Sequence, residues 1–324
     1  MTGHSGLPVI AGVDGTIRSV EAARWAAREA ARRGVGLTIV HASYLNYPPE
    51  ARYSPDAPGE VVERSGADAA LAEAYEAAIQ AEPGLSVTVA AHHEKPAHYL
   101  LTESRSASMI VLGTHPGNSL TGALLGSLSQ TVAAHAMCPV VLVGGAGPDE
   151  AGQPATGPVV VGVSPKPGGR EALHFAFVEA QLRGTPLTAV RSWGDVDWGA
   201  GRLGYGSELF AEWRRMEANV LHTCLAEFAE QFPAVEVRRE LPGKRASLAL
   251  QQAAAGAQLL VVGCHRQDDH WFSRLGSVPS WLLHRSPCPL AIVGQPHALP
   301  ADRPEPVRSP ATSPAAPDGT PVRA

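Results

Sequence analysis

The sequence is poor in cysteine, in net charge and in long apolar runs. Its four cysteines form no CxxC pair and no Cys/His metal spacing, so we expect reduced thiols in a cytoplasmic protein. The net charge of −5 provides no positive field that would attract nucleic acid. No apolar run approaches the roughly 20 residues that span a bilayer, and the opening MTGHSGLPVIAGVDG lacks the pattern of a signal peptide. We therefore expect no disulfide framework and neither nucleic acid nor a membrane as a partner.

Common catalytic motifs are also absent. The sequence contains no GxxxxGK[ST] motif, no nucleophile elbow and no HExxH. His92, His93 and His98 are close in sequence, but no carboxylate or cysteine spacing completes a metal site. We interpret them as surface residues of an edge strand and the following helix. The sequence thus predicts no metal site and no catalytic set.

What the sequence does contain is a duplication at an offset of 150 residues. The matched positions include Gly12 with Gly162, Gly34 with Gly184, Val40 with Val190, Gly113 with Gly263, and Cys138 with Cys288. A period of this length is that of a whole domain and not of a solenoid unit. A residue kept in both copies is expected to serve the fold, whereas a residue present in one copy is free to carry function or to be lost.

Each copy alternates short apolar strands with helices. In the first copy we expect strands at 8–13, 37–42, 87–89, 109–112 and 140–143, and helices at 17–33, 60–80, 96–104 and 127–136. The second copy follows the same order, with a strand at 158–163 and helices at 171–183 and 208–231. Strands that alternate with helices predict an α/β fold with a parallel, doubly wound sheet in each copy.

Composition divides the chain into four parts. We predict a first domain at 1–146, a linker at 147–157, a second domain at 158–295 and a disordered tail at 296–324. The linker is rich in glycine and proline, and the tail is rich in proline, alanine and serine without periodicity.

The segment 113–129 has the chemistry of a phosphate site. A strand ends at Gly113, a loop of small residues follows, and a helix begins near Gly126 and Ser127, so backbone N–H groups and the positive end of a helix dipole converge. Ser129 could add a hydroxyl, and Asp14 ends the first strand, where ligands of doubly wound sheets bind. The alternative is that the glycines only turn the chain and Ser127 only caps the helix. Spacing alone leaves both interpretations open.

Each copy resembles a universal stress protein domain, and the pair resembles the tandem form of high-GC actinobacteria. The resemblance rests on VIAGVDGT, on KPAHYLL…ASMIVLGTH, and on a G-x2-G-x9-G-[ST] signature that leads into SQTVAAHAMCPVVLV. It covers nearly the whole chain except the tail. It implies a five-stranded sheet of order 3-2-1-4-5 with helices on both faces in each domain. It also implies two subclasses, one that binds ATP and one that does not.

The resemblance implies an ATP site in the first domain, with or without Mg²⁺. Asp14 is the family's acidic residue after the first strand, the backbone near Val40 meets adenine, and the signature glycines and hydroxyl wrap the phosphates. His115 falls where the family often has a basic residue facing phosphate, although a solvent-exposed histidine without a role is equally compatible. The implied cofactor-binding set is Gly12, Asp14, Val40, Gly113, His115, Gly117, Gly126, Ser127 and Ser129.

The chain departs from the signature in both copies. Pro116 replaces the second signature glycine, and because proline has no N–H, one donor is lost at a cost of about 0.5–1.5 kcal/mol. Gly117 beside it can take over the contact, so binding is weakened without being forbidden. In the second copy, Ser164 replaces Asp14, Arg266 replaces the second glycine and Pro279 replaces Ser129. We interpret the second site as degenerate.

Three functions are compatible with these residues. The first is an ATP-binding stress-response regulator that acts through nucleotide held by the first domain. The second is an interaction protein with both pockets empty. The third is a slow ATPase or adenylate-transferring enzyme, and the missing catalytic motifs count against it. In the family, domains pair through the fifth strand, so residues 140–143 and 290–293 are expected to pair within one chain or across a homodimer.

Overall fold

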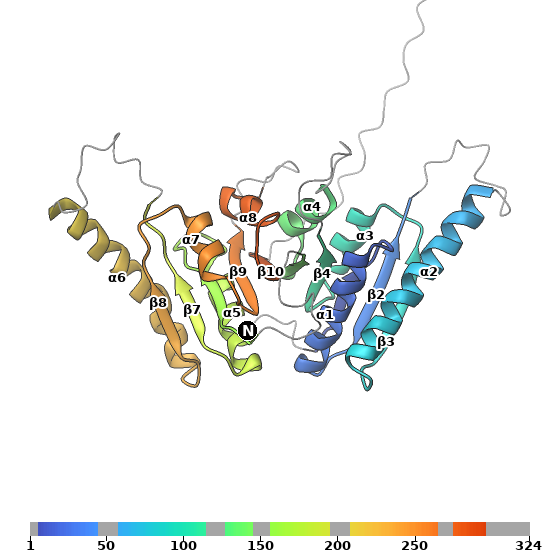
Figure 1. The fold of residues 1–324 in the computed structure, drawn as a ribbon, viewed down its shortest axis with the longest axis horizontal. Helices are drawn as coiled ribbons and strands as arrows, with labels where there is room; N and C mark the ends of the chain where they lie inside the picture. Colours follow the sequence, from blue (N-terminus) through green and yellow to red (C-terminus); the bar gives the residue numbers. More distant parts are fainter. Residues whose placement is uncertain are drawn as a thin grey trace, which may run out of the picture.

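The computed structural model describes residues 6–44, 58–114, 127–144, 156–194, 208–264 and 275–295. Two halves with the same order of elements lie side by side (Figure 1). The first half contains β1 (Val9–Gly12), α1 (Ile17–Arg33), β2 (Leu37–Ala42), α2 (Pro58–Ala81), β3 (Val87–His92), α3 (Pro96–Glu103), β4 (Met109–Gly113), α4 (Ser127–His135) and β5 (Val140–Val143). The second contains β6 (Val159–Gly162), α5 (Gly169–Arg183), β7 (Leu187–Val190), α6 (Glu208–Gln231), β8 (Val237–Glu240), α7 (Ala246–Ala253), β9 (Leu259–Cys264), α8 (Ser277–Leu282) and β10 (Leu290–Gly294).

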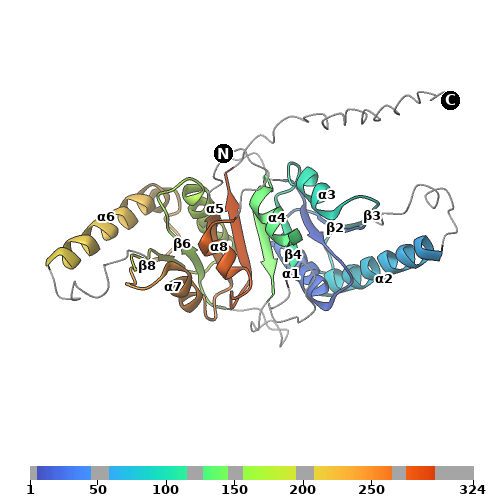
Figure 2. The same ribbon diagram turned by 90° about the horizontal axis from the view of Figure 1, so that it is seen from above.

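All strands join one ten-stranded sheet of order β3-β2-β1-β4-β5-β10-β9-β6-β7-β8. Within each half the strands are parallel and follow the order 3-2-1-4-5, which confirms the predicted fold class. The halves meet at β5 and β10, which pair antiparallel with Val141 opposite Ala291. Figure 2 shows these two strands side by side at the centre of the molecule. The fifth strands therefore pair within the chain, the first of the two arrangements left open by the sequence.

Helices cover both faces of the sheet, as predicted. One apolar core lies between the sheet and α1, α2, α5 and α6, with Leu71 and Phe177 among its members. The other lies under α3, α4, α7 and α8, with Leu100 and Leu282 among its members. Each core runs through both halves, so the two domains share their interior layers as well as their sheet.

The helix α1 shows why these boundaries were readable from the sequence. Thr16 accepts the Ser19 N–H as an N-cap, and Gly34 ends the helix in the left-handed region at φ 66°. Between them the buried positions are mainly alanine, which lets the helix lie close to the sheet. Its counterpart α5 also ends on a left-handed glycine, Gly184, but it begins at Gly168 without a side-chain cap.

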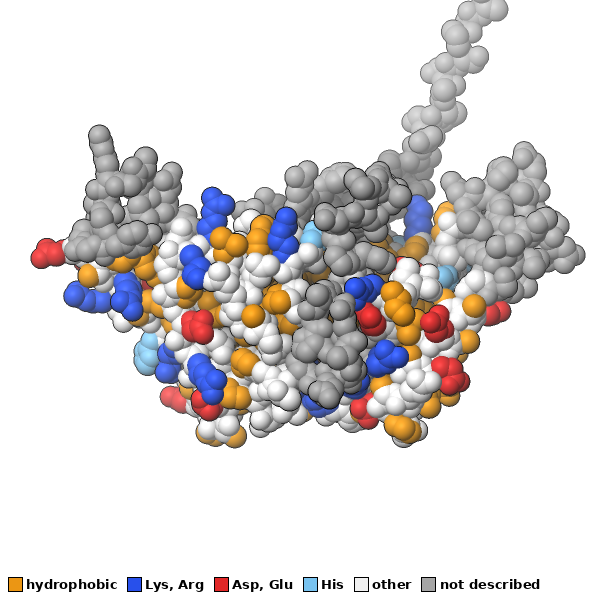
Figure 3. All heavy atoms as spheres, in the orientation of Figure 1, with side chains coloured by type: hydrophobic (Ala, Val, Ile, Leu, Met, Phe, Trp, Pro, Cys, Tyr) orange, Lys and Arg blue, Asp and Glu red, His pale blue; other side chains and the backbone are white. Residues whose placement is uncertain are grey.

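The outer strands β3 and β8 are the edges of the sheet. Val89 of β3 is exposed, which confirms the predicted half-exposed edge strand. β8 reads VRRE, and exposed charges of this kind discourage pairing with another chain. Figure 3 shows acidic and basic side chains over both halves of the visible face. No helix in the described part of the chain is long and apolar enough to cross a membrane.

The four cysteines form no disulfide, as expected. Cys138 and Cys288 occupy equivalent positions before β5 and β10, and burial raises the pKa of each thiol to about 12. Residues 147–155 of the predicted linker and the predicted tail at 296–324 lie outside the described residues.

Candidate functional site

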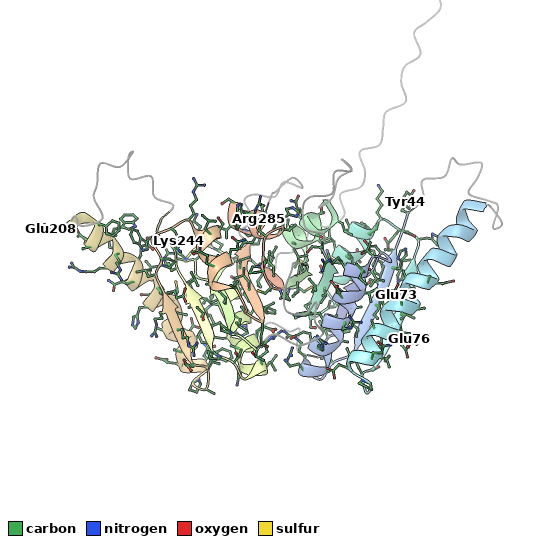
Figure 4. The ribbon with its side chains drawn as sticks, in the orientation of Figure 1. Tyr44, Glu73, Glu76, Glu208, Lys244 and Arg285 are labelled. Carbon is green, nitrogen blue, oxygen red and sulfur yellow. The ribbon has the colours of Figure 1, made fainter. Side chains whose placement is uncertain are left out.

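The candidate site of the first half lies where β1 and β4 end. Gly12 is in register with Val40 of β2 and with Leu112 of β4, so the three strands finish at one edge. The chain connections reverse direction between β1 and β4, and ligands of open α/β sheets bind at such switch points. Figure 4 shows Tyr44, which follows β2, and Lys244, which follows β8, along the same side of the molecule. The carboxyl edges of the two halves thus face the same way.

Asp14 is exposed at this edge and shapes the turn into α1. Its Oδ1 accepts the Thr16 N–H at 3.1 Å and the Thr16 hydroxyl at 2.6 Å, and its own N–H donates to Ser19 Oγ at 3.3 Å. In the second half the Ser164 hydroxyl oxygen accepts the Lys166 N–H at 3.2 Å. A neutral oxygen therefore holds the same turn, and the negative charge of Asp14 is an addition found in the first half.

Packing accounts for the glycines at the ends of β1 and β4, although only Gly113 faces backbone atoms that cannot yield, whereas Gly12 faces the end of a flexible side chain. A Cβ at Gly12 would lie 2.6 Å from Leu112 Cδ2, and one at Gly113 would lie 2.6 Å from the Arg18 backbone. In the second half, a Cβ at Gly263 would meet the Gly168 carbonyl oxygen at 2.7 Å. Because the duplicate positions have the same constraint, these glycines do not by themselves distinguish a ligand site from a structural turn.

Val40 lies too deep in the sheet to present its backbone to a ligand. It is 1% exposed, and its carbonyl accepts the Val13 N–H at 2.9 Å. Residues two apart on a parallel strand direct their backbone groups toward the same neighbouring strand. The residue that follows Val40 on that side is Ala42, the last of β2. The backbone contact expected near Val40 stays a prediction, with Ala42 as its candidate at the end of β2.

A basic side chain, missed in the sequence, crosses the end of the first strand in both halves. His41 Nδ1 donates to the Val13 carbonyl at 3.0 Å. At the equivalent place, Arg191 Nη1 donates to the Val163 carbonyl at 3.2 Å, and its Nε contacts the Glu217 carboxylate at 2.6 Å. The second half thus has a permanent charge that is already neutralised by α6. The duplication carried a signal for this contact, because positions 41 and 191 both have a basic residue.

The phosphate side of the predicted site is described only in part. His115, Gly117 and Gly126 lie outside the described residues. Ser127 is the first residue of α4, and Ser129 is half-buried in its first turn. The structure therefore places the beginning of α4 and leaves the signature loop a prediction.

The second half differs at the corresponding helix and strand. The helix α8 is shorter than α4, and Pro279 is buried within it. Trp193, which corresponds to Ser43, is buried against Phe210 at a ring distance of 4.5 Å, and its Nε1 donates to the Leu241 carbonyl at 3.1 Å. The second half therefore has a tryptophan and a proline at the positions where the first half has Ser43 and Ser129.

Among the described residues, no group of three His, Cys, Asp or Glu side chains is placed to hold a metal ion. His92 was expected at the surface, but it is half-buried and stacks on Tyr99 with 4.1 Å between ring centres. His98 is exposed and contacts Glu94 at 2.8 Å. The histidines near β3 therefore have packing and surface roles.

Comparison with known proteins gives the same division into halves. The model of the universal stress protein family matches residues 7–144 and again residues 156–294. The universal stress protein Rv2005c of Mycobacterium tuberculosis is 33% identical over 294 residues, which cover 89% of this chain and 97% of that protein. Rv1996 of the same organism is 31% identical over 321 residues, covering 92% of this chain and 99% of that protein.

A solved structure shows the same architecture. A universal stress protein from Archaeoglobus fulgidus matches with a TM-score of 0.64 at 18% identity, over 90% of this chain and 97% of that chain. A universal stress protein solved in complex with cAMP matches 43% of this chain and 98% of its own, with 25% identity and a TM-score of 0.36. Since the family model covers both halves and the relatives span nearly the whole chain, this chain belongs to the universal stress protein family, with two domains in tandem.

Proposed function

We propose that the chain is a stress-response regulator that binds an adenine nucleotide at the carboxyl edge of its first half. The observation that carries the proposal is the charge of Asp14. Ser164 holds the same turn in the second half without a charge, so the turn does not require a carboxylate. A carboxylate at the switch point of such a sheet is suited to accept hydrogen bonds from ribose hydroxyls.

The same charge sets the direction of the nucleotide. A carboxylate repels phosphate, so the sugar lies at Asp14 and the phosphates extend away from it. The beginning of α4 attracts them, because its first turn has unsatisfied N–H groups and no acidic side chain. In this arrangement His115, Gly117, Gly126 and the Ser127 hydroxyl contact phosphate, and Mg²⁺ accompanies the nucleotide, since the described residues contain no group of three metal-binding side chains.

Adenine then lies over the end of β2. The backbone of Ala42 is the first on this side to extend past the hydrogen bond between Val13 and Val40, so it is placed to pair with the edge of the base. His41 is held at its side by the Val13 carbonyl. The proposed contact therefore moves two residues along the strand from Val40.

The second half is proposed not to bind nucleotide. It has Ser164 in place of the carboxylate, and its Arg191 is occupied by Glu217. Pro279 in α8 has no N–H to offer a phosphate. The second half thus acts as the partner of the first.

The test exchanges the residues that differ between the halves. Asp14→Ser gives the first half the turn residue of the second, which keeps the turn and removes the charge. We expect ATP to raise the melting temperature of the wild-type chain. Ligand at 100 times its Kd stabilises by about 2.7 kcal/mol, which is several degrees for a domain of this size. Asp14→Ser should melt like the wild type without ATP and lose this rise.

The control is Ser164→Asp, which places a carboxylate at the equivalent turn and should leave the response to ATP unchanged. Mass spectrometry of freshly purified protein would identify any nucleotide that remains bound. If millimolar ATP with Mg²⁺ leaves the melting temperature of the wild-type chain unchanged, the nucleotide proposal is wrong.

The second candidate function is an interaction protein with an empty site. It is favoured by Gly12 and Gly113, since packing accounts for both glycines, and by Pro116, which removes a phosphate donor. Absence of any nucleotide effect on a well-folded chain would support this function.

A further inference from the structure

Four charged side chains meet where the two halves join. Glu29 and Arg33 come from the last turns of α1, and Glu179 and Arg183 come from the last turns of α5. Arg183 contacts Glu29 at 2.7 Å and Arg33 contacts Glu29 at 2.8 Å, while both arginines also hydrogen-bond Glu179. Each arginine thus bridges the glutamate of its own helix and that of the other half. We call this set the clasp.

The clasp is separate from the candidate nucleotide site. The helix α1 begins at the carboxyl edge of the sheet, just after β1, and ends just before β2 starts. Its last turns therefore lie at the amino edge, on the opposite side of the sheet from Asp14. The clasp joins domains and takes no part in the proposed ligand contacts.

The clasp is buried and continues into aromatic contacts. The side chains of both glutamates are fully buried, and Arg183 is 3% exposed. Arg33 lies over the Phe175 ring at 5.6 Å, and Arg183 lies over the Trp25 ring at 6.0 Å. Each arginine therefore contacts both a carboxylate and an aromatic ring of the other half.

Every member of the set has its counterpart at the offset of 150: Glu29 with Glu179, Arg33 with Arg183, and Trp25 with Phe175. An interface in which residue i contacts j and j contacts i is isologous, and it is complementary to itself. A domain that presents this pattern can pair with any other domain that presents it.

Stability alone does not explain buried charges. Apolar residues of similar volume often stabilise such a position equally well, whereas a buried charge that loses its partner is strongly destabilising. A paired clasp therefore adds little to the stability of the correct interface, whereas an incorrect interface that leaves the clasp charges unpaired is strongly destabilised.

We propose that the clasp selects the partner of each domain. Only a domain that has a glutamate and, one turn later, an arginine at the end of its first helix can pair with a half of this chain through the fifth strands. The partner is the other half of the same chain or a second copy of either half. A domain of the same fold that lacks these charges is rejected, because its approach would bury unpaired charges.

The test reverses the charges of the clasp in full-length chains. The first-half swap combines Glu29→Arg with Arg32→Glu and Arg33→Glu, because Arg32 also contacts Glu29, and the second-half swap combines Glu179→Arg with Arg183→Glu. Each swap places like charges across the joint and should lower the melting temperature by about 10 °C. The chain with both swaps restores opposite charges and should melt within about 2 °C of the wild type.

Mixing provides the sharper measurement. The swapped first half of one chain matches the swapped second half of the other, and the two remaining wild-type halves also match. Each single-swap chain should therefore form a dimer of twice the mass of the chain by native mass spectrometry. Its partner is a second copy of itself, in which swapped halves pair with each other and wild-type halves pair with each other, or the other single-swap chain when the two are co-expressed with different tags. The wild-type chain and the double-swap chain, co-expressed in the same way, have no mismatch to relieve and should not exchange.

The control for charge reversal is the ion pair between Arg170 and Glu227, which joins α5 to α6 within the second half and is largely exposed. Reversing both of its charges should leave the melting temperature and the mass unchanged. Single swaps that melt like the wild type, or a double swap that fails to recover, would overturn the proposal, and so would single-swap chains that stay at the mass of one chain both alone and when mixed.

Discussion

The two halves of this chain have the same skeleton and different carboxyl edges. Strand order, turn glycines, the left-handed ends of α1 and α5 and the cysteines before β5 and β10 are repeated at the same offset. At the edge, Asp14 corresponds to Ser164, His41 to the ion-paired Arg191, and Ser43 to the buried Trp193. The comparison separates what the fold requires from what a ligand site would require, using one molecule as its own reference.

The largest expected effect on the free energy of unfolding comes from the clasp, to which the two halves contribute nearly equivalent residues. Glu29 contacts three arginines, since Arg32 adds a contact at 2.7 Å, whereas Glu179 contacts two. Glu29→Gln leaves more uncompensated positive charge, so it should cost about 3–5 kcal/mol and Glu179→Gln somewhat less.

Urea unfolding of the two variants beside the wild type measures this order. A larger loss for Glu179→Gln would show that the halves contribute to the joint in a way that these contacts do not describe.

The next largest effect tests whether the two halves place the same steric constraint on equivalent glycines. Gly113→Ala and Gly263→Ala each place a Cβ within 2.7 Å of backbone atoms at the start of the first helix of the same half, at Arg18 of α1 or at Gly168 directly before α5. Backbone cannot yield as a side chain can, so each variant should lose about 1–3 kcal/mol of stability. Differential scanning calorimetry would measure both losses. Gly84→Ala is the matched control, because nothing lies within 4 Å of its Cβ and its φ is not positive.

The smallest effect near neutral pH is the dependence of the free energy of unfolding on pH, to which both halves contribute. Burial raises the pKa of Cys138 and Cys288 to about 12, so the folded chain keeps both thiols protonated while the unfolded chain releases their protons above about pH 9. Their contribution to stability is complete below about pH 9 and is lost progressively between about pH 9 and pH 12.

Replacing both cysteines by alanine should flatten the fall in stability across this range. In the folded chain at pH 8, iodoacetamide should modify Cys224, which is half-buried, before any of the three buried thiols, Cys138, Cys264 and Cys288. Rapid modification of Cys138 or Cys288 would contradict their assigned burial.

Much of the fold could be predicted because its signals are local. The boundaries of α1 follow from Thr16 and Gly34, and the edge position of β3 follows from its polar alternation. The sheet order came from family resemblance, since apolar runs do not specify which strands are neighbours. The internal pairing of β5 and β10 depends on contacts between distant segments, and the sequence left it open.

The candidate site stays a prediction, and its geometry is less readable from the sequence than the fold. The sequence suggested a backbone contact near Val40, but the depth of Val40 depends on the register with Val13, which sequence patterns do not fix. The clasp was missed for a related reason. Glu29 and Arg33 have the spacing of an ordinary surface ion pair, and this spacing does not reveal their contacts with Arg183 and Glu179 of the second half. Their repetition at 179 and 183 was the available signal.

The antiparallel joint of β5 and β10 has a consequence for how such a chain can change over time. In a homodimer every substitution occurs twice, once on each side of the axis, whereas in this chain it occurs once. The covalent connection also holds the halves together at an effective concentration on the order of millimolar. A substitution that weakens association or removes a ligand contact from one half is therefore tolerated while the other half stays intact. Fusion of the two halves therefore allows one half to lose its ligand pocket while the interface between the halves is retained.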